Sequence, residues 1–174
     1  WSDIDLTLLP VDEAHPLVER AIKSLFMSLQ ETVARGTGTK IGYALRYPSD
    51  APGLDGKTRS GLLDARVVVG PPNPYTVLTN ALWSHFPVAD FLIEKIAETK
   101  VNWSRTNDSP RVVQPDLKVG AGGLRSFQTA NWIRAALGER MERPSSAYER
   151  VLACRNVLHL VSDRFTDKFS HERR

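Results

Sequence analysis

The chain of 174 residues is long enough to bury a hydrophobic core in one large domain or two small ones, and its composition, 41% hydrophobic and 25% charged, is that of an ordinary globular protein. The net charge of +3 is modest and the basic residues are scattered except at the C-terminal end, so composition gives only a weak case for a nucleic-acid partner. The single cysteine, Cys154, excludes an internal disulfide and a cysteine-rich zinc site, and no apolar run approaches the roughly 20 residues of a membrane helix. We therefore expect a cytoplasmic protein without a membrane segment.

The first predicted strand, residues 3–9, carries two carboxylates. Alternation along a strand places Asp3 and Asp5 on one face and the apolar residues between and after them on the other. Two neighbouring carboxylates can hold Mg²⁺, which proteins usually bind through one or two carboxylates together with the phosphates of a substrate. Because so short a pair also arises by chance in a chain of this length, the pair by itself does not establish a metal site.

A helix and two further strands are predicted after this stretch. Apolar residues at helical spacing between residues 17 and 33, followed by Gly36, indicate a helix, and residues 40–47 read as a second strand that carries Arg46 near its end. Residues 48–57 are rich in proline, glycine and aspartate and predict a loop. After a short helix or turn, the β-branched residues of segment 63–70 predict a third strand.

Two charged residues share a face of this predicted third strand, namely Asp64 and Arg66. Since an unpaired buried charge is costly, the two side chains need a structural or a functional reason. They form either a local ion pair at the edge of a sheet, or a third metal-binding carboxylate with a phosphate-binding arginine.

The prolines at positions 71, 72 and 74 mark a predicted domain boundary, with a first α/β domain over residues 1–72 and a helical domain over residues 73–174. Helices are predicted over residues 75–83, 88–103, 124–137 and 145–163. Between the second and third of these, the segment 114–125 has three glycines in four positions, flanked by Lys118 and Arg125. Such a loop can present backbone N–H groups to an anion at the start of a helix, or it can be a flexible hinge between domains.

The segments SDIDL, IGYALR, LLDARVVVG, QPDLKVGAGGLRSFQTANW and ERVLACRNVLHLVSDR follow one another in an order that resembles the PII uridylyltransferase/uridylyl-removing enzymes. That family modifies a nitrogen-signalling protein and belongs to the DNA polymerase β-like nucleotidyltransferase superfamily. The resemblance covers nearly the whole chain, and its most specific part is the glycine-rich element. It implies an α+β fold, in which a small mixed sheet packed with helices is followed by an all-helical segment.

The resemblance also implies a site and a reaction. Asp3, Asp5 and, in the LLDAR segment, Asp64 would hold two Mg²⁺ ions, which orient a nucleoside triphosphate and activate an incoming hydroxyl. The residues expected to contact the nucleotide are Ser2, Arg46, Arg66, Lys118 and Arg125. Lys118 and Arg125 would either touch the phosphates or stabilise the interface between the domains. The implied enzyme is a nucleotidyltransferase that moves a uridylyl group from UTP to a hydroxyl of a PII-type protein.

Departures from the family pattern leave two alternative functions open. The family's Gly-Ser turn precedes the Asp-x-Asp strand, so we expect further residues upstream of Trp1, and the HD hydrolase and ACT domains lie outside this chain. In the glycine-rich element Val119, Ala121 and Ser126 replace the family's glutamate, proline and aspartate. A catalytically inactive nucleotide-binding relative is therefore one alternative. An RNA nucleotidyltransferase is the other.

Overall fold

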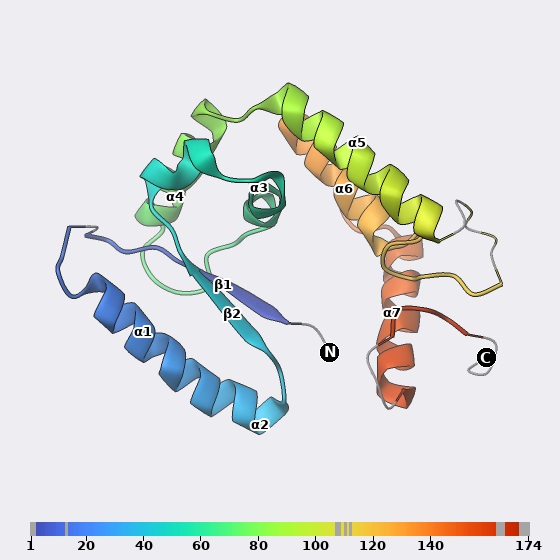
Figure 1. Cartoon of the computed structure of the whole chain (residues 1–174), viewed down its shortest axis with the longest axis horizontal. Helices are drawn as coiled ribbons and strands as arrows, with labels where there is room; N and C mark the ends of the chain where they lie inside the picture. The colour runs from blue at the N-terminus through green and yellow to red at the C-terminus, as the bar shows by residue number, and fades with distance from the viewer. Residues whose placement is uncertain are drawn as a thin grey trace. The chain divides into compact units, whose positions relative to one another are not determined.

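The computed structural model describes residues 3–12, 14–106, 109, 111, 113–162 and 166–170, and divides into two compact units, Trp1–Phe86 and Pro87–Arg174 (Figure 1). The first unit combines a small sheet with helices, and the second is helical apart from one isolated bridge between Asp116 and Lys168. The predicted α+β class is confirmed at this level. The sequence predicted a domain boundary after residue 72. In the structure, the helix that follows this point, Asn73–Ser84, belongs to the first unit, which extends to Phe86.

The sheet of the first unit has two described strands, β1 (Ile4–Leu8) and β2 (Ile41–Leu45), which pair in parallel with Ile4 opposite Ile41. Parallel neighbours need a crossover connection, and α1 (Val18–Leu29) supplies it, continued by the π-helical turn η1 (Gln30–Ala34) and the short α2 (Arg35–Thr37). Figure 1 shows α1 running beside the two strands. The ring of Phe26 on α1 lies 4.1 Å from that of Tyr43 on β2, between centroids. Helix α1 therefore covers the apolar face of the sheet, and the predicted first helix and first two strands are confirmed.

The rest of the first unit packs around four buried leucines. After β2 the chain forms the 3₁₀ helix η2 (Pro48–Gly53), α3 (Gly56–Leu63) and α4 (Asn73–Ser84). The Asp55 carboxylate caps α3 by accepting a hydrogen bond from the Thr58 backbone N–H at 2.6 Å. The leucines of this core are Leu54, Leu62, Leu78 and Leu82, with Leu9 and Phe86 packed against them.

The predicted third strand over residues 63–70 is wrong. Helix α3 extends through Leu63, Asp64 is its C-terminal cap, and residues 65–68 have no regular structure. The helical conformation is favoured over a strand because it buries Leu62 in the leucine core, whereas neither described strand pairs with this segment. Without a strand partner the β-branched residues stay at the surface, and Val69 is 90% exposed.

The second unit consists of α5 (Val88–Arg105), α6 (Leu124–Ala136) and α7 (Ser146–Val161). Helices α5 and α6 pack against each other, and Phe91 and Trp132 are buried in this unit. The Ser145 hydroxyl caps α7 by accepting from the Tyr148 backbone N–H, and the Tyr148 ring packs on Phe127 of α6. The four helices predicted after residue 73, α4 included, are confirmed. Within the described residues, every helix is too short or too polar to traverse a lipid bilayer.

Candidate functional site

The open face of the sheet carries the two predicted metal-binding carboxylates. Asp3 directly precedes β1 and Asp5 lies within it, and both residues are exposed. Asp5 is paired with Gly42, and a Cβ atom at position 42 would lie 3.0 Å from the Asp5 Oδ1 atom. Alternation places both carboxylates on the face opposite the one that α1 covers, beside a β2 that carries only Gly42 and Ala44 on that side. The small side chains of β2 therefore leave the Asp5 carboxylate accessible.

Arg46 directly follows β2 and lies on the same face of the sheet as Asp5. Its backbone N–H donates to the Leu8 carbonyl at 3.1 Å, so the strand pairing continues to this residue and alternation turns its side chain towards the face of Asp5. The Asp55 pKa lies below its ordinary value, mainly because the Thr58 backbone and side chain donate to the carboxylate, with smaller contributions from the charges of Arg46 and Lys57. The charge of Arg46 thus acts on Asp55, the N-terminal cap of α3.

The structure does not bring the third predicted carboxylate to this pair. Asp64 ends α3 instead of lying on a strand next to β1. Within the described ranges no group of three or more histidine, cysteine, aspartate or glutamate side chains is placed to hold a metal ion. Arg66 is exposed in the irregular segment that follows Asp64, and Ser2 lies outside the described residues. Of the residues predicted for the site in the first unit, Asp3, Asp5 and Arg46 thus lie on one face of the sheet, with Arg46 four residues beyond Gly42, the partner of Asp5.

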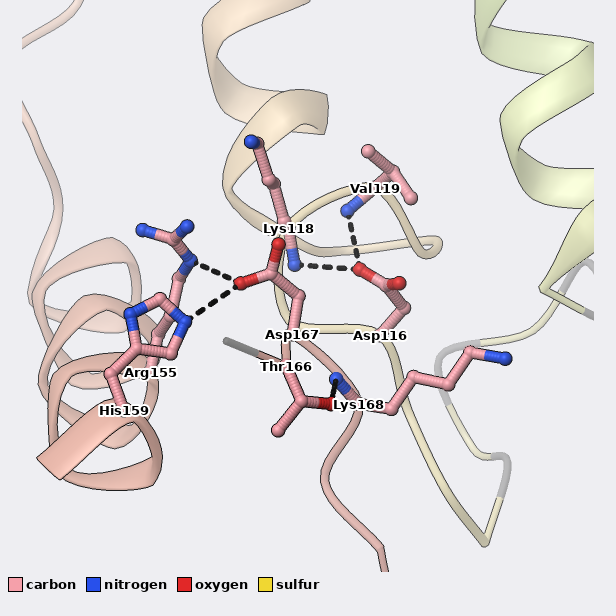
Figure 2. Close-up of polar contacts among 8 residues, drawn as sticks. All are labelled: Asp116, Lys118, Val119, Arg155, His159, Thr166, Asp167 and Lys168. Atoms are coloured by element: carbon pink, nitrogen blue, oxygen red, sulfur yellow. Dashed lines mark hydrogen bonds and ion pairs between the residues drawn. The ribbon is translucent and has the colours of Figure 1, made fainter. Parts of the chain in front are cut away.

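The glycine-rich loop, residues 116–123, uses its backbone donors internally. The Asp116 carboxylate accepts hydrogen bonds from the backbone N–H groups of Lys118 and Val119, at 3.0 and 2.8 Å (Figure 2). At the start of α6, the N–H groups of Leu124 and Arg125 donate to the carbonyls of Leu117 and Lys118. The backbone N–H groups at this end of α6 therefore already donate to acceptors within the loop, and an anion would have to compete with those acceptors.

Close packing and backbone conformation explain the glycines of the loop. A Cβ atom at Gly120 would lie 2.6 Å from the Asp116 carbonyl oxygen, and one at Gly123 would lie 2.9 Å from the Leu117 carbonyl oxygen. Gly122 has a φ of 78°, in the left-handed region that other residues rarely adopt. These contacts and the left-handed conformation account for glycine at positions 120, 122 and 123.

Lys118 and Arg125 occupy different surroundings within the second unit. The Arg125 guanidinium lies 5.1 Å from the centroid of the buried Trp132 ring, and it lines a cavity of about 10 Å³ between α5 and α6. The Lys95 ammonium lies 5.6 Å from the centroid of the same ring. Arg125 therefore packs inside the helical unit by a cation–π contact. Whether Lys118 and Arg125 also contact phosphates stays a prediction.

The sequence did not predict that two cationic side chains, Lys95 and Arg59, are buried. Lys95 is 2% exposed and its ammonium lies 2.7 Å from a Glu98 carboxylate oxygen. Arg59, 9% exposed on α3, donates from Nη2 to the Pro52 carbonyl, while its buried Nε has no hydrogen-bond partner among the described residues. Both residues sit in ordinary helical patterns with charged neighbours, so only the tertiary packing reveals their burial.

A second charged cluster that the sequence did not indicate involves Asp167. The Arg155 Nε donates to the Asp167 Oδ1 atom at 2.7 Å, and the His159 Nε2 lies 3.1 Å from the same oxygen (Figure 2). Partial burial alone would raise the Asp167 pKa, but the hydrogen bond and charge of Arg155, helped by His159 and Lys118, hold that pKa below its ordinary value.

We expect acid to weaken the second unit through Asp167. Because the folded-state pKa of this carboxyl is depressed, its contribution to the free energy of unfolding is present above about pH 4 and is lost as the pH falls through the folded-state pKa. Chemical unfolding of the wild type and of Asp167→Asn between pH 7 and pH 2 measures the contribution of Asp167 to the free energy of unfolding. The stability difference between the two proteins should shrink in the acidic range. A stability difference that stays constant from pH 7 to pH 2 would contradict a lowered pKa of Asp167 in the folded state.

Comparisons with known protein sequences match this chain to uridylyltransferases. A family model described as GlnD PII-uridylyltransferase matches residues 90–143. A bifunctional uridylyltransferase/uridylyl-removing enzyme of Gluconobacter oxydans is 32% identical over 151 residues, which is 83% of this chain and 15% of that protein. Enzymes of the same name from Erythrobacter litoralis and Azospirillum brasilense are 31% and 27% identical, over 86% and 99% of this chain. The chain spans 16% and 20% of the length of these two relatives. No solved structure matches the chain.

Proposed function

The chain belongs to the family of the bifunctional uridylyltransferase/uridylyl-removing enzymes, and from this premise we propose that it is part of the region that transfers the uridylyl group. The proposed reaction is Mg²⁺-dependent transfer from UTP to a hydroxyl of a PII-type signal protein in the cytoplasm, with release of pyrophosphate. The names of the relatives support the reaction type. The observation that carries the proposal on this chain is the exposed pair of carboxylates on the open face of the sheet.

The donor set of this face fits Mg²⁺. Asp3 and Asp5 offer carboxylate oxygens, and Gly42 places no side chain against the Asp5 carboxylate that would crowd an ion. A bound ion would neutralise charge on the triphosphate and orient it for in-line attack. Asp3 and Asp5 are the residues proposed to hold it.

Arg46 is proposed to bind the triphosphate. The strand pairing continues to Arg46 on the face of Asp5, and the charge of Arg46 helps to lower the Asp55 pKa after the larger effect of the Thr58 hydrogen bonds. An arginine at this point can donate to phosphate oxygens with two N–H groups at once. Arg66, Lys118 and Arg125 are proposed only as further sources of positive charge around the nucleotide, because the second unit uses Arg125 for packing.

A nucleotide-binding relative without turnover is the second candidate. The position of Asp64 at the end of α3 favours it, since a site for two metal ions needs more acidic ligands than Asp3 and Asp5 provide. This candidate predicts binding of UTP with Mg²⁺ but no release of pyrophosphate.

The test compares nucleotide binding and turnover in the protein that carries this chain. Isothermal titration with UTP is run with Mg²⁺ and with a chelator, alongside ATP and CTP, and pyrophosphate release is followed in the presence of a PII-type protein. We expect Mg²⁺-dependent UTP binding that the double variant Asp3→Asn/Asp5→Asn loses. Binding without pyrophosphate release would select the inactive relative. UTP binding of equal strength with and without Mg²⁺ would refute the proposed metal-dependent site.

A further inference from the structure

We draw no further inference here: the strongest candidate, the exposed apolar face of α7 around Val157, Leu160 and Val161, carries none, because nothing in the described part of the chain shows what covers it.

Discussion

If the proposed function holds, Asp5→Asn is expected to lower Mg²⁺-dependent uridylyl transfer by the protein that carries this chain at least about 100-fold, because loss of a residue that merely supports a metal ligand already costs 10–100-fold. Asparagine keeps the shape of the side chain and removes the negative charge that attracts the cation. The Asp5 carboxylate lies against Gly42 on the open face of the sheet, where the amide fits without disturbing β1. Initial rates of pyrophosphate release at saturating UTP, measured over a range of Mg²⁺ concentrations, give the effect.

The control for this variant is Glu31→Gln. Glu31 is an exposed residue that pairs with Arg35, and its replacement makes the same change in charge within the same unit. Its rate should stay close to that of the wild type, since exposed ion pairs contribute little. If Asp5→Asn retains transfer within about threefold of the wild type while Mg²⁺ remains required, the ion is held elsewhere.

Gly120→Ala is expected to destabilise the second unit by about 1–3 kcal/mol, the usual cost of forcing extra atoms into a packed site. The added methyl group would lie 2.6 Å from the Asp116 carbonyl oxygen, which also accepts the Gly120 N–H. Because the obstructing atom belongs to the backbone, the loop itself must shift, and with it the hydrogen bonds that start α6. Urea unfolding followed by circular dichroism measures the change in the free energy of unfolding.

Gly61→Ala provides the comparison for the loop variant. Gly61 lies in α3, and no atom outside its immediate neighbours lies within 4 Å of the position that a Cβ atom would take. Alanine there should leave stability unchanged or raise it by roughly 0.5–1 kcal/mol, because it favours the helix. Equal effects of the two substitutions would show that close packing is not the reason for glycine at position 120.

Local patterns predicted those elements of the fold in which sequence preference and packing agree. Alternation around Asp5 predicted β1, and helical spacing with proline and glycine at the ends predicted most of the helices. The same alternation predicted that Asp3 and Asp5 share one face of the sheet. Resemblance of motifs identified the family, which the comparisons confirm.

Packing between distant segments decided the remaining features. Segment 63–70 has the residues of a strand, yet a strand requires a partner, and burial of Leu62 made its first part helical and removed Asp64 from the sheet. The glycine-rich loop was visible in the sequence, but only the positions of the Asp116 and Leu117 carbonyls show that its glycines prevent collisions. Asp167 and His159 lie on separate segments, and no pattern of spacing relates them.

The sequence by itself therefore determined the first two strands and their carboxylates, most of the helices and the family of this protein, because each depends on residues close together in the chain or on motifs compared as a whole. The tertiary structure decided which carboxylates meet, which cations are buried and what the glycines do. Those outcomes depend on which distant atoms compete for the same space and the same hydrogen bonds, and local sequence preference carries no information about that competition.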